Sequence, residues 1–215
     1  MDENEISLLI QSILLERNTA FLKEQDIQIY LAVKLIESEI FDNVFVEYRV
    51  PINLINDYPW GNTNKIDIDI LLEKEGRFMP VEIKYKTKST IIERRLLGTN
   101  TRIELANHVA HTNSCYDIWK DVKRNELLAS TFDSVNNGVV IFITNDEKYI
   151  HGPNNRSSYY NFSFRNTSEI NEVRWGPNVN ASKLISHPNY VLDITYNINW
   201  VNMNINECEF KLLIL

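Results

Sequence analysis

The first part of the chain changes from helical to strand-like spacing of its apolar residues. Over residues 6–15 and 21–40, apolar residues recur every three or four positions, which predicts two helices or one helix broken near residues 18–19. Over residues 44–50 they alternate with other residues, as in a strand, and Pro51 ends that pattern. We therefore expect a helical N-terminal region followed by a strand.

A second alternating pattern covers residues 66–73 and 78–85 and is interrupted by a polar turn around Glu75 and Gly76. The turn has Gly76 where a positive φ is tolerated, as tight hairpin turns require. The pattern predicts a β-hairpin with these two residues at its tip.

Helical spacing returns over residues 101–129, and residues 139–143 are apolar throughout, as in a buried strand. The predicted order is therefore helix, strand, hairpin, helix, strand. This order indicates an α/β core over about residues 21–144.

The C-terminal third is more polar but retains the character of a folded segment. Residues 145–186 are rich in Asn and Ser, and also in aromatic residues, which is untypical of a disordered linker. We interpret these aromatic residues as a satellite of the core, and residues 190–194 and 210–215 as closing strands. A single domain over residues 1–215 is expected, with a C-terminal β-rich elaboration over about residues 145–215.

Charge is distributed unevenly along the chain. The 215 residues carry a net charge of −7, which argues against a polyanionic partner. However, the first 47 residues hold three Lys and Arg against ten Asp and Glu, whereas residues 84–124 hold nine against four. DNA therefore remains a candidate partner, and the candidate DNA-binding residues in the positive segment are Lys86, Lys88, Lys120, Lys123 and Arg124.

The sequence also argues against two classes of protein. No window approaches the ~20 apolar residues of a membrane-spanning helix, and the acidic N-terminus is unlike a secretory signal, so a cytoplasmic location is expected. Cys115 and Cys208 lie far apart, without CxxC spacing or a histidine at metal-binding spacing. Neither a disulfide framework nor a zinc site is therefore predicted.

The predicted hairpin carries the residues best suited to chemistry. In its register Asp69 faces Glu82 and Asp67 faces Lys84. Because like charges directly opposite destabilise a hairpin, the Asp69 and Glu82 carboxylates call for a cation between them. Mg²⁺ prefers such oxygen ligands, and the backbone carbonyl of Ile83 is a further donor. The Lys84 ammonium can then orient or deprotonate a water, or stabilise a phosphorane-like transition state.

Asp69, followed thirteen residues later by Glu82-Ile83-Lys84 across a hairpin, resembles the signature of the PD-(D/E)xK nuclease superfamily. The predicted order over about residues 21–144 is similar to that family's αβββαβ core, the restriction-endonuclease-like fold with a central mixed sheet flanked by helices. Ile68 stands in place of the signature's proline, which leaves Asp67 as a rival first acid. The hairpin register favours Asp69.

This resemblance implies an Mg²⁺-dependent deoxyribonuclease that hydrolyses DNA phosphodiester bonds, with Mn²⁺ as a substitute metal. It implies that Asp69, Glu82 and the Ile83 carbonyl hold the metal and that Lys84 assists the attacking water.

Many members also present a helix glutamate to the metal, and Glu24 is the candidate for that position. The alternative is that Glu24 is an exposed acid favoured by the helix dipole. Glu47 is a second contender. We interpret His108 and His111, three residues apart, as structural or surface residues rather than as a metal-binding pair.

Two functions therefore stay open. One is an active nuclease. The other is a catalytically inactive module of the same fold that binds nucleic acid or a protein partner in a defence or repair assembly. A homodimer or a partner subunit is compatible with both.

Overall fold

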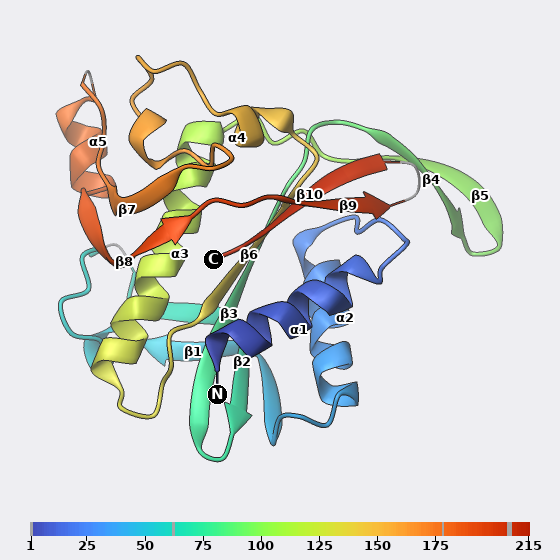
Figure 1. Ribbon diagram of the computed structural model, residues 1–215, viewed down its shortest axis with the longest axis horizontal. Coiled ribbons are helices and arrows are strands. Elements are labelled where there is room, and N and C mark those ends of the chain that lie inside the picture. The colour runs from blue at the N-terminus through green and yellow to red at the C-terminus, as the bar shows by residue number, and fades with distance from the viewer. Residues whose placement is uncertain (1, 62, 178, 206–207) are drawn as a thin grey trace.

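The computed structural model describes residues 2–61, 63–177, 179–205 and 208–215. It is an α/β arrangement in which helices flank a central mixed sheet (Figure 1). The helices are α1 (Glu3–Leu15), α2 (Glu24–Glu37), α3 (His111–Thr131), α4 (Glu147–His151) and α5 (Ala181–Ser186), with short 3-10 turns η1 (Ile52–Leu54) and η2 (Tyr160–Phe162). The strands are β1 (Asn43–Pro51), β2 (Lys65–Lys74), β3 (Arg77–Lys86), β4 (Ile91–Leu96), β5 (Thr99–Glu104), β6 (Val139–Thr144), β7 (Glu169–Val173), β8 (Tyr190–Asn197), β9 (Val201–Ile205) and β10 (Cys208–Ile214).

The central sheet has six strands in the order β1-β2-β3-β6-β10-β9. Strands β3 and β6 are parallel, and the other neighbouring pairs in this sheet are antiparallel. Two small antiparallel pairs, β4–β5 and β7–β8, lie outside it. The coarse prediction of a mixed sheet flanked by helices is confirmed.

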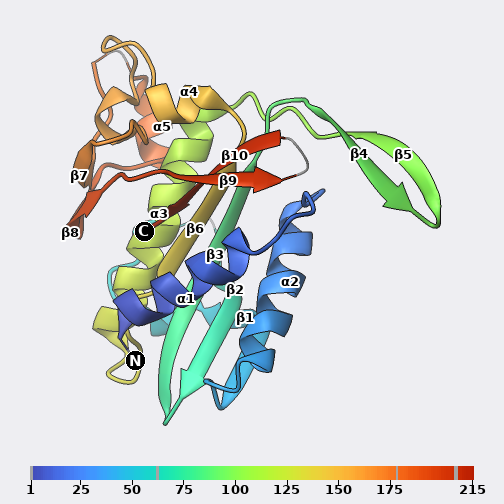
Figure 2. The same cartoon turned by 45° about the vertical axis from the view of Figure 1, so that its right-hand side comes forward.

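Two helical layers cover opposite faces of the sheet (Figure 2). Helices α1 and α2 pack with one face of β3 in a cluster that includes Val81, Ile83 and Tyr85. Helix α3 packs with Val140 and Phe142 of β6 in a second cluster. The strands in the middle of the sheet are therefore buried on both sides, as their apolar sequences require.

The N-terminal helical region consists of two helices. The Asp2 carboxylate caps α1 by accepting hydrogen bonds from the N–H groups of Asn4 and Glu5. Helix α2 buries Ile27, Leu31 and Leu35 at four-residue spacing, which confirms its predicted core-facing side.

The β2–β3 hairpin has the predicted turn and register. Ile70 pairs with Val81 and Leu72 with Met79 across the ladder, and Gly76 has a φ of +72° at the turn. The ladder extends from the Lys74–Arg77 pair to the Ile70–Val81 pair. It therefore ends one position before Asp69 and Glu82, which sit where the two strands begin to separate.

The predicted helix over residues 101–129 is wrong in its first ten residues. Residues 99–104 form β5, which pairs with β4, and α3 begins only at His111. The turn of this hairpin is Leu97-Gly98, and both residues have positive φ values. Leucine is an uncommon residue at such a position, so Gly98 was the one turn residue that the sequence offered here.

The C-terminal residues complete the central sheet as well as elaborating it. Strand β10 pairs with β6, and β9 pairs with β10, whereas the predicted strand at 190–194 belongs to β8 and pairs with β7. Phe162, Phe164 and Trp175 are buried against α3, which confirms the satellite-core interpretation. In the described parts of the chain, no helix is long and apolar enough to cross a membrane.

Candidate active site

The candidate site begins where β2 and β3 separate. The N–H of Ile83 donates a hydrogen bond to Asp69 Oδ2 (2.7 Å), and the N–H of Tyr85 donates to Glu24 Oε2 (2.9 Å). A continuing ladder would have paired these amides with β2 carbonyls. Instead, two carboxylates from β2 and from the first turn of α2 satisfy them, which fixes both acids beside β3.

Gln28 of α2 is a buried polar residue that links three elements. Its Nε2 donates to the backbone carbonyl of Asp69 (2.9 Å) and to Glu47 Oε1 (2.8 Å). Glu47 interrupts β1 with a φ of +54°. The second contender for a metal-binding glutamate is therefore held by Gln28 on the β1 side of Asp69.

The opposite face of β3 presents charged residues to α3. Glu82 is buried, with 3% of its surface exposed. Lys84 Nζ lies 2.7 Å from Asp121 Oδ2, and Arg124 Nη1 lies 2.8 Å from Asp121 Oδ1. Tyr58 OH accepts a hydrogen bond from Arg124 Nε (3.0 Å). Helix α3 thus supplies the ion pair of Asp121 and Arg124, which joins the charged residues of the β2–β3 hairpin in one network.

This network contains more negative than positive charge. Among the described residues, the carboxylates that interact electrostatically with Lys84 or Asp121, together with Asp121 itself, are those of Glu24, Asp69, Glu82, Asp117 and Asp121, and the cations are Lys84, Lys120 and Arg124. With every group ionised, five negative charges face three positive charges. An excess of this kind is costly in a partly buried site unless protons or a cation reduce it.

Burial, and after it the neighbouring negative charge, raises the pKa values of two acids in the network. Burial raises the pKa of Asp69 to about 6, although Lys84 and the Ile83 amide favour the ionised carboxylate. Burial, and then the repulsion from Asp121, raises the pKa of Glu82 well above its usual range. Perturbed acids of this kind are typical of functional sites.

The pKa of Lys84 is also raised, which for a lysine favours the charged form. Burial by itself lowers the pKa of the ammonium, but the carboxylates of Asp121, Glu82 and Glu24 outweigh that effect and raise it above its ordinary value. Lys84 is therefore a permanently charged group near neutral pH, suited to stabilising negative charge and unsuited to removing a proton from water.

The donor types and the charge of this site are those that a divalent metal requires. Carboxylates and a backbone carbonyl are the hard oxygen donors that Mg²⁺ prefers, and two positive charges match the excess at the site. Within the described ranges, however, no group of three or more His, Cys, Asp or Glu side chains is arranged to hold a metal.

The rival acid Asp67 lies outside this network. Its carboxylate makes ion pairs with Arg49 (2.7 Å) and Lys65 (2.9 Å), and hydrogen bonds from these two residues lower its pKa. Asp69, two residues away, is the acid of β2 that lies beside Glu24, Glu82 and Lys84.

The candidate DNA-binding residues are spread over several environments. Lys123 makes ion pairs with Glu126 and Asp193, Lys120 lies over the Trp60 ring, and Arg124 belongs to the Lys84 network. Lys86 is half-buried on β3 and Lys88 is exposed after it. The three α3 cations are thus engaged within the chain instead of forming one free helix edge.

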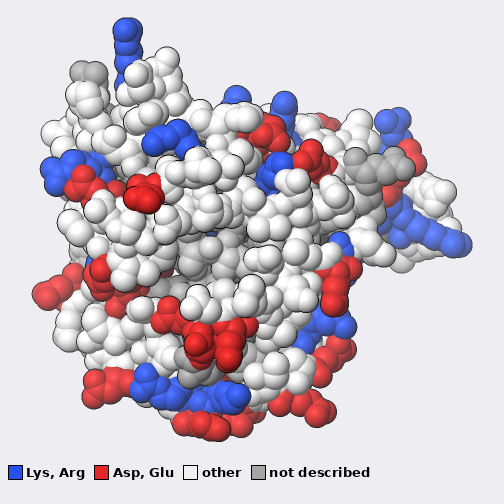
Figure 3. All heavy atoms as spheres, viewed as in Figure 1, with Lys and Arg blue, Asp and Glu red and all other residues white. Residues whose placement is uncertain are grey.

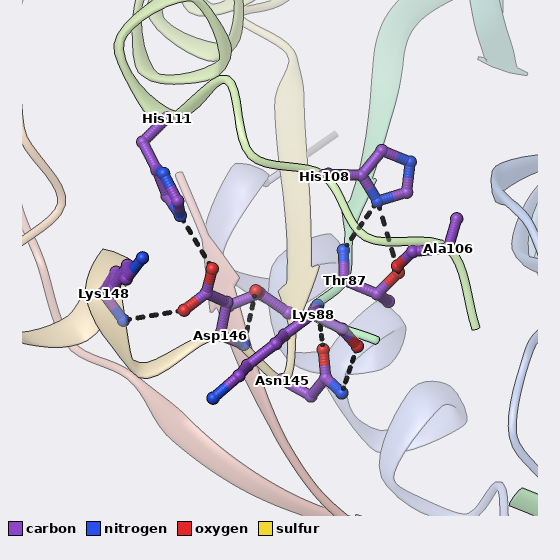
Figure 4. Close-up of polar contacts among 9 residues, drawn as sticks. Thr87, Lys88, Ala106, His108, His111, Asn145, Asp146 and Lys148 are labelled. Atoms are coloured by element: carbon purple, nitrogen blue, oxygen red, sulfur yellow. Dashed lines mark hydrogen bonds and ion pairs between the residues drawn. The ribbon is translucent and has the colours of Figure 1, made fainter. Parts of the chain in front are cut away.

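The two histidines bind separate partners (Figure 4). His108 Nδ1 accepts a hydrogen bond from the Thr87 N–H (2.9 Å), whereas His111 Nε2 lies 2.7 Å from Asp146 Oδ2. These contacts fit the structural interpretation of both residues.

Sequence reasoning missed Asp121 and Gln28. Asp121 precedes Arg124 by three residues, a spacing that helices use for surface ion pairs, so its sequence context resembles that of an exposed acid. The available signal was its position between Ile118 and Val122 on the buried side of α3. Gln28 follows Ile27 on the core side of α2, which made it a candidate for a buried polar role.

Comparison with known proteins gave no match: no family model, no curated protein and no solved structure is significantly similar to this chain.

Proposed function

We propose that this protein is a metal-dependent nuclease that hydrolyses DNA phosphodiester bonds and has a restriction-endonuclease-like αβββαβ core. The observation that carries the proposal is the buried excess of negative charge where β2 and β3 separate, beside a lysine that stays charged. A divalent cation balances that excess, and a phosphate group would be drawn to the cation and to Lys84.

In this proposal Asp69 and Glu82 would hold Mg²⁺ or Mn²⁺ with the backbone carbonyl of Ile83. The metal would polarise the scissile phosphate and activate a water. Glu24 contributes negative charge beside Asp69 and fixes the end of β3 through the Tyr85 amide. The order α2, β1, β2, β3, α3, β6 supports the αβββαβ assignment, with the β4–β5 hairpin inserted before α3.

Lys84 stabilises negative charge that develops on the phosphoryl group, because its raised pKa keeps the ammonium protonated. Asp121 holds that ammonium in place from α3, and Arg124 binds the other oxygen of the same carboxylate. Asp121 is therefore a positioning residue for Lys84.

The decisive measurement is cleavage of supercoiled and linear DNA by the purified chain with Mg²⁺ or Mn²⁺. We expect wild type to cut DNA and Lys84→Ala to lose at least about a hundredfold of the rate, the size of effect that one positioned charged group supplies. Lys34→Ala is the matched control, because Lys34 is an exposed lysine on α2 that pairs with Glu37; it should cut like wild type.

Loss of Lys84 also leaves buried Asp121 with Arg124 alone, so the variant is expected to melt at a lower temperature. The assay is therefore run below the melting temperature measured by circular dichroism, with Lys84→Met as a second variant that keeps the stem packed. Undiminished cleavage by both folded variants would contradict the proposed role of Lys84.

The second candidate is the catalytically inactive module. It is favoured by the engagement of Lys84 with Asp121 at 2.7 Å, since a lysine held in an ion pair can be purely structural. Calorimetric titration with Mg²⁺ separates the two. An active site should bind the metal and lose it in Asp69→Asn, while Asp67→Asn should bind as wild type does. Equal binding, or equal absence of binding, in all three proteins favours the inactive module.

A further inference from the structure

The β4–β5 hairpin projects from the body as a two-stranded arm (Figures 1 and 2). Its strands pair with each other from the Ile91–Glu104 pair to the Leu96–Thr99 pair. Ile92 is buried in the core cluster at the base of the arm, and Ile103 packs against it. The base is thus anchored, whereas the distal half extends into solvent.

The base is also held by a set of polar contacts directly after β3 (Figure 4). Asn145 accepts a hydrogen bond from the Lys88 N–H and donates to the Lys88 carbonyl and to Thr90 Oγ1. Thr87 Oγ1 donates to the Ala106 carbonyl, and the Leu105 N–H donates to the Thr90 carbonyl. Both ends of the arm are therefore fixed to the end of the strand that carries Lys84, which limits the ordering cost of binding a partner.

The distal half of the arm carries unpaired positive charge. Arg95 and Arg102 are exposed, and because Arg102 is opposite Glu93, these three side chains share one face. Arg94 lies on the other face opposite Thr101. In the part of the chain that the structure describes, none of these three arginines forms an ion pair, unlike Arg49, Arg124 and Arg174. Figure 3 shows blue Lys and Arg side chains on the arm, with red Asp or Glu side chains beside them.

The tip combines a strained backbone with an apolar side chain. Leu97 has a φ of +50° and its side chain is fully exposed. A leucine gains nothing from such a turn, where Asn or Gly would be unstrained, and nothing from burial. The Leu97 side chain is therefore an exposed apolar group at the end of the arm.

The length of the β4–β5 arm and the chemistry of its side chains match the major groove of duplex DNA. Strands of six residues are ~20 Å long, and the major groove, ~12 Å wide, admits a two-stranded ribbon. Arginines bind phosphates and guanine edges, and an apolar tip can contact the thymine methyl group.

We propose that the β4–β5 arm binds the major groove of double-stranded DNA, with Arg94, Arg95 and Arg102 on phosphates or base edges and Leu97 leading into the groove. This inference rests on the proposed nuclease function and gives it a duplex substrate. The arm then holds the duplex next to the end of β3.

The test measures binding of a short fluorescein-labelled DNA duplex by anisotropy in EDTA, so that cleavage plays no part. The triple variant Arg94→Ala, Arg95→Ala, Arg102→Ala should bind at least about tenfold more weakly at low salt, and the slope of log Kd against log salt should fall by roughly 2 to 3, since each phosphate contact contributes about 0.9. Leu97→Ala should weaken binding a few-fold with an unchanged slope.

The control variant Arg49→Ala, Arg156→Ala, Arg174→Ala removes the same charge from exposed arginines outside the arm and should change Kd by less than about threefold. Unlabelled RNA duplex of the same sequence should compete poorly, because its major groove is too deep and narrow for side chains to read.

Equal weakening by both triple variants, absence of duplex binding by wild type, or stronger competition by single-stranded DNA would each overturn the proposal. Light scattering supplies a further test. If wild type is a dimer and Leu97→Asp converts it to a monomer without changing DNA binding, the proposal is overturned and the arm is assigned to contact with a second copy of the chain. If wild type binds duplex DNA through the arm but cuts no DNA, the result supports the DNA-binding role of the arm and contradicts only the proposed nuclease activity.

Discussion

The two faces of β3 carry opposite chemistry. Toward α1 and α2, the strand presents Val81, Ile83 and Tyr85 to the hydrophobic core. Toward α3, it presents Glu82 and Lys84 in a network of ionisable groups. The first face lowers the free energy of the fold by burying apolar surface, whereas the second costs desolvation that its ion pairs only partly offset. Such a cost is typical of a functional site.

The largest effect on stability should come from the apolar face. Ile83→Ala removes a fully buried side chain and should lower the free energy of unfolding by about 2 to 5 kcal/mol, while the backbone carbonyl proposed as a metal donor remains. Urea denaturation measures the change. Ile29→Ala is the matched control, since Ile29 is exposed on α2, and its effect should stay within about 0.5 kcal/mol. Equal losses from the two variants would contradict the assignment of the core face.

The charged face should instead show a dependence on pH. Asp69 has a pKa of about 6 in the folded chain against an ordinary value of 3.8, so the folded state favours the protonated acid. Its contribution to stability is fully present below about pH 4 and is lost as the pH rises through about 6. In EDTA, the stability of Asp69→Asn relative to wild type should therefore rise by on the order of 3 kcal/mol between pH 4 and pH 7.

Asp67→Asn should behave in the opposite sense. The pKa of Asp67 is lowered by Arg49 and Lys65, so the stability that it contributes is present above the unfolded pKa and is lost as the pH falls. Relative to wild type, Asp67→Asn should become less stable as the pH rises from 3 to 7. The same pH trend in both variants would argue against distinct environments for the two acids.

The smallest expected effect is a gain in stability. Glu82→Gln removes a buried carboxylate that is repelled by Asp121 and Asp69 and should raise the free energy of unfolding at pH 8 by on the order of 1 kcal/mol. The same substitution should abolish Mg²⁺-dependent cleavage. Thermal denaturation and the DNA cleavage assay measure the two effects, with the exposed Glu169→Gln expected to change neither. A large loss of stability in Glu82→Gln would show that the ionised carboxylate supports the fold.

Local patterns predicted the hairpin and its register. The alternation on β2 and β3 and the turn at Gly76 were sufficient, because register in a hairpin follows from the turn and from the face that is buried. The two N-terminal helices were predicted for a similar reason, since the four-residue spacing on α2 marks one face for burial.

The β4–β5 arm was not predicted because its turn signal is weak and because apolar residues near it have helical spacing. Leu105 and Val109 lie four residues apart, which suggests a helix, yet Leu105 is buried beside the arm and Val109 is exposed before α3 begins. The chain forms a hairpin there because Ile92 and Ile103 are opposite each other and pack into the core, a tertiary gain that overrides local spacing.

The sequence by itself determined which residues could meet across the β2–β3 hairpin, because pairing and side-chain alternation are properties of neighbouring strands. It therefore placed Asp69 near Glu82 and put Lys84 on the same face as Glu82. Only the tertiary structure decided that the strands separate at Asp69, that Glu24 binds the Tyr85 amide, and that Asp121 reaches Lys84. These contacts join residues distant in sequence, and they depend on how α2 and α3 dock on the sheet, which no local pattern encodes.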